Sequence, residues 1–68
     1  NLKSAGMKSI IVIEKRYLLQ AGIRALIQEI PGLTLSKSWS GDEPHLTAII
    51  LKHKPDLLIV NPSSLTPE

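Results

Sequence analysis

Two short runs of aliphatic residues constrain the fold of this chain more than any other feature of its sequence. Residues 10–13 and 57–60 each hold four consecutive aliphatic side chains. A short strand that is apolar at every position is typical of a parallel sheet covered on both faces. A polar residue follows each run directly, Glu14 after the first and Asn61 after the second. The sequence therefore predicts two buried strands, over residues 9–14 and 57–60, with polar side chains at their carboxyl ends.

The segment between residues 17 and 30 is predicted to form a helix. Pro31 and Gly32 end it, because neither residue continues a helix well. Gly22 lies inside the helix, where we expect it to allow close packing on a strand. The spacing predicts an apolar face made of Leu19, Ile23, Leu26, Ile27 and Ile30, with Gln20, Arg24 and Gln28 on the opposite side.

A second strand and a second helix are predicted between residues 33 and 54. Residues 33–39 alternate between apolar and polar, with Leu33, Leu35, Lys37 and Trp39 on one side, which indicates an edge strand with one apolar face. After a loop at residues 40–43, Pro44 suits the first turn of a helix, and Pro55 ends that helix. The expected inner face of the helix consists of Leu46, Ile49, Ile50 and His53.

The order of these elements is β-α-β-α-β, which predicts an α/β fold. Right-handed crossovers make the sheet parallel. Because the first and third strands are apolar throughout and the second alternates, we expect strand order 2-1-3 with the helices on opposite faces. In such a sheet, ligands bind at the carboxyl ends of the strands where the strand order reverses. That crevice would hold Glu14, Lys15 and Asn61.

Composition and charge exclude several classes of protein. The 68 residues include no cysteine, so neither a disulfide nor a thiolate zinc site is available. The net charge is only +2 and the basic residues are scattered, whereas a nucleic-acid surface shows a clustered stripe. His45 and His53 lack carboxylate neighbours at ligand spacing, so we expect no metal site and no cofactor. Ser63 and Ser64 have no histidine base near them in sequence, so no catalytic residue is predicted.

The chain also lacks the patterns of membrane and secreted proteins. No apolar run approaches the ~20 residues of a membrane span. No signal peptide is evident, and the absence of cysteine fits a reducing compartment, so we expect a cytoplasmic protein that does not contact a membrane. Residues 1–7 carry no pattern and are expected to be a disordered lead-in or a vector remnant.

Two segments give the chain a resemblance to a known family. Residues 18–27 (LLQAGIRALI) and 55–60 (PDLLIV) resemble segments of response-regulator receiver domains of the kind that precede LuxR-type helix-turn-helix domains. The resemblance extends from about Lys8 to Leu65. It implies a flavodoxin-like, three-layer fold truncated after the third strand, so that residues 8–68 form the N-terminal half of a receiver-like domain. The family's fourth and fifth strands would lie downstream.

The resemblance also implies a degenerate phosphorylation site. The family's phosphate-accepting aspartate falls at Asn61, whose amide cannot form an acyl phosphate. The family's acidic pair falls at Glu14 and Lys15, and a lysine repels Mg²⁺, which prefers carboxylate oxygens. We therefore expect no phosphorylation at Asn61, and we expect the Lys15 ammonium to take the place of the metal by bonding Glu14 or Asn61. A plain turn is the other interpretation of Asn61, because asparagine before proline commonly forms one.

These features predict a degenerate receiver module that regulates transcription, within two-component signal transduction, through protein contacts and not as an enzyme. A three-stranded sheet would leave an open apolar edge, and such edges recruit other chains. We expect a homodimer through the third strand or the uncovered sheet face, and contact with DNA only through a downstream output domain. Two alternatives remain: a flavodoxin-like domain that binds a small ligand, although residues 14–17 contain no glycine, and a fragment of an α/β enzyme.

Overall fold

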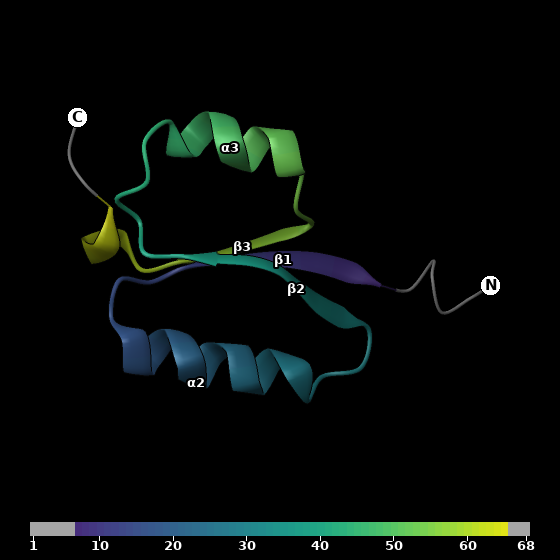
Figure 1. Ribbon diagram of the computed structural model, residues 1–68. Helices are drawn as coiled ribbons and strands as arrows, with labels where there is room; N and C mark the ends of the chain where they lie inside the picture. Colours follow the sequence, from purple (N-terminus) through teal and green to yellow (C-terminus); the bar gives the residue numbers. More distant parts are fainter. Residues whose placement is uncertain (1–6, 66–68) are drawn as a thin grey trace.

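The computed structural model describes residues 7–65, which form a three-stranded parallel sheet between two helices. The elements are β1 (Lys8–Ile13), α2 (Tyr17–Gln28), β2 (Leu33–Trp39), α3 (Leu46–His53), β3 (Leu57–Val60) and the 3-10 turn η1 (Pro62–Ser64). The sheet order is β2-β1-β3, with α2 on one face and α3 on the other (Figure 1). This arrangement confirms the predicted α/β, flavodoxin-like fold. The expected lead-in falls almost entirely on residues 1–6, which lie outside the described residues, as do residues 66–68.

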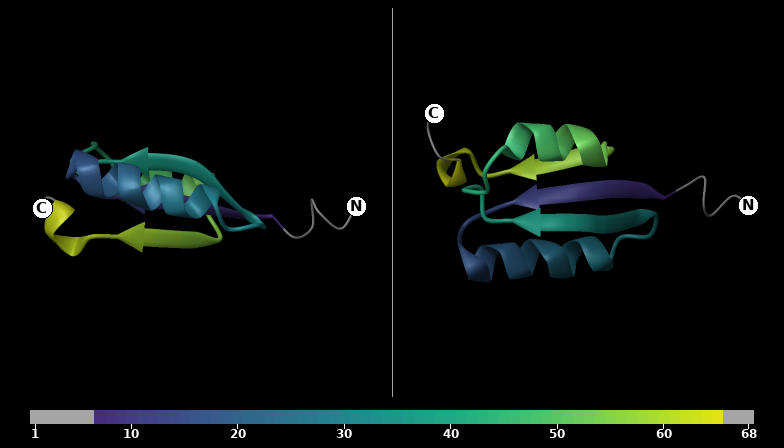
Figure 2. Two further views of the ribbon diagram at one scale, coloured as in Figure 1. Left: turned by 90° about the horizontal axis from the view of Figure 1, so that it is seen from below. Right: turned by 45° about the horizontal axis from the view of Figure 1, so that its top comes forward.

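The central strand β1 supplies most of the core. Its four aliphatic residues, 10–13, are all buried, because strands lie on both sides of β1 and a helix covers each face (Figure 2). Ile10 and Val12 pack against Ile27 of α2, and Ile23, Leu33 and Leu35 surround this cluster. The central position of β1 in the sheet therefore accounts for its unbroken apolar run, as expected for a parallel strand.

The prediction that β2 has a single apolar face is wrong, because the strand contains an irregularity. Ile10 pairs with Leu35, but Ile11 pairs with Lys37, so Ser36 is an extra residue in the ladder. One extra residue moves every later side chain to the other face. Leu35 accordingly packs in the cluster on the α2 side, whereas the Trp39 ring meets His53 of α3 on the other side, with ring centroids 5.6 Å apart.

Helix α2 differs from its prediction in both its length and its inner face. It ends at Gln28 instead of residue 30, and the chain turns at Gly32, whose φ of 87° suits glycine. Only Ile27 is buried, while Leu26 stays 63% exposed, because the two strands beneath α2 cover a narrower stripe than the apolar sequence offers. The polar Gln20, predicted on the outer side, instead reaches the backbone of the sheet.

Gly22 does not pack on a strand, contrary to the prediction. A Cβ added at Gly22 would have no atom within 4 Å, so the residue borders open space. It lies on the side of α2 that faces away from the sheet, together with Leu18, which is 83% exposed. The glycine therefore has no role in packing within residues 7–65.

Helix α3 begins later than predicted. Pro44 lies outside it, since the N-cap His45 adopts a left-handed backbone conformation with φ of 58°, which no helix continues through. Leu46, Ile49 and Ile50 are half-buried, as expected for an inner face. His53 remains exposed and contributes through its edge contact with Trp39.

Strand β3 forms one edge of the sheet. Its residues Leu57 and Leu58 are 50% and 41% exposed, and no strand of residues 7–65 lies along its outer side. The predicted open apolar edge is therefore present in the described part of the chain, and the prediction that the strand at residues 57–60 is buried is wrong there. The carboxyl ends of β1 and β3 lie side by side at one end of the sheet (Figure 2).

Candidate functional site

The candidate site lies where β1 and β3 end side by side. Glu14 follows β1, and its backbone N–H donates to the Trp39 carbonyl at 2.9 Å. Asn61 follows β3, and its N–H donates to the Ile13 carbonyl at 3.0 Å. These two bonds extend the sheet by one residue on each side. They fix Glu14 and Asn61 next to each other at the predicted switch point.

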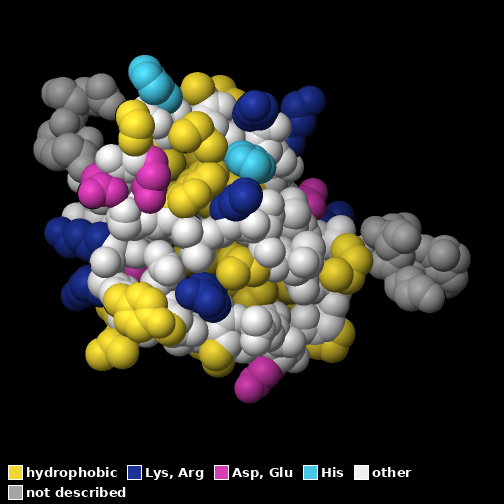
Figure 3. Space-filling model, in the orientation of Figure 1, with side chains coloured by type: hydrophobic (Ala, Val, Ile, Leu, Met, Phe, Trp, Pro, Cys, Tyr) yellow, Lys and Arg dark blue, Asp and Glu magenta, His cyan; other side chains and the backbone are white. Residues whose placement is uncertain are grey.

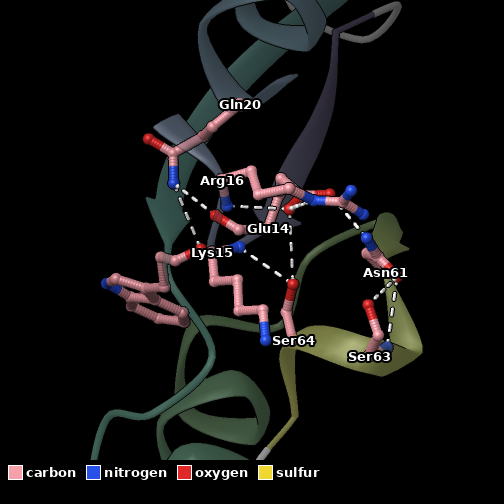
Figure 4. Close-up of polar contacts among 8 residues, drawn as sticks. Glu14, Lys15, Arg16, Gln20, Asn61, Ser63 and Ser64 are labelled. Carbon is pink, nitrogen blue, oxygen red and sulfur yellow. Dashed lines mark hydrogen bonds and ion pairs between the residues drawn. The ribbon is translucent and has the colours of Figure 1, made fainter. Parts of the chain in front are cut away.

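The Glu14 carboxylate is the centre of the site, and only 3% of the residue is exposed. The Asn61 side-chain amide donates to one of its oxygens at 2.8 Å, and the Arg16 backbone N–H donates to the other at 2.8 Å (Figure 4). The Arg16 Nε and the Ser64 hydroxyl both approach that second oxygen at 3.4 Å. Both carboxylate oxygens therefore accept at least one short hydrogen bond, and the donors gather on the second oxygen.

This environment keeps Glu14 ionised. The hydrogen bond from the Arg16 backbone lowers the pKa of the carboxyl most, followed by the hydrogen bond from the Asn61 side chain. Burial acts in the opposite direction but is outweighed, and the Arg16 guanidinium adds a further lowering. Glu14 is therefore a buried anion whose charge is neutralised by fixed donors.

The oxygen of the Asn61 side chain faces the other way, into η1. It accepts hydrogen bonds from the Ser63 backbone at 3.1 Å and from the Ser63 hydroxyl at 2.9 Å. This is the local turn that asparagine before proline favours. The side-chain oxygen of Asn61 thus forms the predicted turn, and its amide nitrogen binds Glu14.

The predicted role of Lys15 is wrong. Its side chain is exposed, and within residues 7–65 no hydrogen bond or ion pair joins its ammonium to Glu14 or Asn61 (Figure 4). Only its backbone enters the site, where its N–H donates to the Ser64 hydroxyl at 2.8 Å. The cation beside the carboxylate is Arg16, because the chain turns back after β1 and brings the residue two positions after Glu14 to its carboxylate.

Three residues of the site were missed from the sequence: Arg16, Ser64 and Gln20. The Gln20 amide donates to the backbone carbonyls of Glu14 and Trp39, at 3.1 and 3.2 Å, and so ties α2 to the ends of two strands. Ser64 lies three residues after Asn61, a spacing that would have pointed to it had a one-turn helix been expected there. Nothing in the spacing of Gln20 would have distinguished it from a surface residue.

A similar link joins the other ends of β1 and β3. The Asp56 carboxylate accepts a hydrogen bond of 2.7 Å from the Ser9 backbone, and the Asp56 N–H donates to the Ser9 carbonyl at 2.9 Å. The bond from the Ser9 backbone is the largest cause of a lowered pKa at Asp56. One buried carboxylate and one exposed carboxylate therefore hold the β1–β3 pair at its two ends.

The chemistry open to the site is limited by these contacts. Position 61 offers an amide and no carboxylate nucleophile, and the one carboxylate of the crevice already accepts hydrogen bonds at both oxygens. A Mg²⁺ ion would have to displace them to gain a single carboxylate ligand, whereas it prefers one or two carboxylates together with water. An open hollow of about 900 Å³ lies between residues 41–45 and α3, but neither Glu14 nor Asn61 lines it.

Comparison with protein families, characterised proteins and solved structures found no match for this chain. Among residues 7–65, neither helix is long and apolar enough to cross a membrane. The same residues contain no group of three or more histidine or acidic side chains arranged to hold a metal ion. The fold and the contacts at the strand ends therefore carry the functional argument.

Proposed function

We propose that this chain is a receiver-like regulatory module that acts through protein contacts and is not phosphorylated at Asn61. One observation carries the proposal: the Asn61 amide donates into the Glu14 carboxylate at the carboxyl ends of β1 and β3. A phosphorylated receiver needs a carboxylate nucleophile and a metal at this place. Here the same place holds a neutral amide and a single carboxylate that accepts hydrogen bonds at both of its oxygens.

The partners of such a module are proteins. Its binding surfaces are the exposed edge of β3 and the outer side of α2, where apolar side chains are exposed to solvent. In this proposal the module forms a homodimer, and it reaches DNA only through a separate output domain. Its role in transcription regulation rests on the sequence resemblance of residues 18–27 and 55–60.

The phosphorylation part of the proposal is tested by exposing the full chain to acetyl phosphate and Mg²⁺. Intact-mass spectrometry is expected to find no added phosphoryl group, while an active receiver domain treated in parallel gains one. A magnesium titration followed by NMR is expected to leave the backbone signals of Glu14 and Asn61 unchanged. A phosphoryl adduct, or saturable shifts at both residues, would overturn the proposal.

The interaction part is tested by sedimentation equilibrium over a range of protein concentration. The expected result is a concentration-dependent dimer whose dissociation constant is the same with and without acetyl phosphate and Mg²⁺. A monomer at every concentration up to the high micromolar range would contradict a homodimeric module. Association that appears only with acetyl phosphate would contradict regulation without phosphorylation.

A further inference from the structure

We draw no further inference here: the strongest candidate, the apolar outer side of α2, where Leu18 and Leu26 are exposed and hydrophobic side chains lie along the lower edge of the molecule in Figure 3, carries nothing, because nothing in the structure of residues 7–65 shows what covers it.

Discussion

The Asn61 side chain donates a hydrogen bond of 2.8 Å to the Glu14 carboxylate and thereby joins the carboxyl ends of β1 and β3. The two residues lie 47 positions apart in the sequence, so the bond closes most of the described chain into one loop. The polarity of the pair is fixed. The amide nitrogen must face Glu14 because its oxygen is already held by Ser63.

Asn61→Asp is expected to destabilise the fold at neutral pH. The new carboxylate would face Glu14 in place of a donor, and two carboxylates this close do not both ionise without cost. The midpoint of thermal unfolding should fall at pH 7. The deficit should shrink as the pH is lowered and one carboxyl becomes protonated.

The double variant Glu14→Gln with Asn61→Asp is the matched control, because it exchanges the amide and the carboxylate. The amide introduced at position 14 can donate to the carboxylate introduced at position 61, so the double variant should recover part of the stability that Asn61→Asp loses. If the stability lost in the double variant equals the sum of the losses in the two single variants, residues 14 and 61 do not interact.

Acid should destabilise the chain through the carboxylates that the fold holds ionised. The pKa of Glu14 and of Asp56 is lowered from 4.5 and 3.8, mainly by hydrogen bonds from the Arg16 and Ser9 backbones respectively. The unfolded chain therefore binds protons at a higher pH than the folded chain does. Their contribution is complete above the unfolded values and is lost as the pH falls from about 4.5 through the folded values.

Urea unfolding at a series of pH values between neutral and acid measures this loss. Glu14→Gln should be less stable than the parent at neutral pH, with a smaller decrease on acidification, because one of the titrating groups is gone. Lys15→Gln is a suitable comparison, since the Lys15 side chain lies outside the carboxylate contacts. A pH profile of Glu14→Gln parallel to that of the parent would contradict the assignment.

Substitution by alanine should change the free energy of unfolding in opposite directions at Gly41 and at Gly22. Gly41 has a φ of 109° and lies against the Ser64 backbone, so a Cβ there is strained and must also displace main-chain atoms. Gly41→Ala is expected to cost more than about 1 kcal/mol of unfolding free energy. Gly22→Ala meets open space inside a helix and should stabilise the monomer by up to ~1 kcal/mol.

Chemical denaturation of dilute protein measures both variants without a contribution from self-association. The Gly41 result bears on the site, because Gly41, in the loop at residues 40–43, lies against the backbone of Ser64 in η1. Glu43 orders that loop by accepting the N–H groups of Ser40 and Gly41, at 3.0 and 2.9 Å. Equal effects of the two substitutions would contradict the close approach at Gly41.

The topology was predictable from the sequence because the apolar pattern of each strand marked its place in the sheet, although β3 carries the pattern of a buried strand and is exposed in residues 7–65. The fully apolar runs marked β1 and β3, and the alternation marked β2 as an edge. The positions of Glu14 and Asn61 at one crevice followed from that topology alone. What could not be predicted was which atoms meet there. Nothing in the order of residues 14–16 indicates that Arg16 turns back to the carboxylate while Lys15 turns away.

The remaining errors have the same origin, since they depend on tertiary packing. The extra residue at Ser36 leaves the period-two pattern of β2 unchanged in sequence, yet it sends Trp39 to the α3 side. The start of α3 depends on the left-handed backbone of His45, a conformation that histidine adopts only occasionally. The apolar stripe of α2 is wider than the sheet beneath it, so periodicity could not identify the buried residue.

Ile27→Ala tests which side of α2 faces the sheet. Ile27 is 4% exposed and packs against Ile10 and Val12, so its loss removes apolar contacts and leaves a cavity. Large-to-small changes of this kind cost roughly 2–5 kcal/mol. A domain of this size has a total stability on the order of 3–10 kcal/mol, so a large unfolded fraction is expected.

The neighbouring residue provides the control for that experiment. Leu26 belonged to the same predicted apolar face, but it is 63% exposed, so Leu26→Ala should change the unfolding free energy of the dilute monomer by about 0.5 kcal/mol or less. Equal losses for Ile27→Ala and Leu26→Ala in dilute solution would mean that α2 is rotated on the sheet.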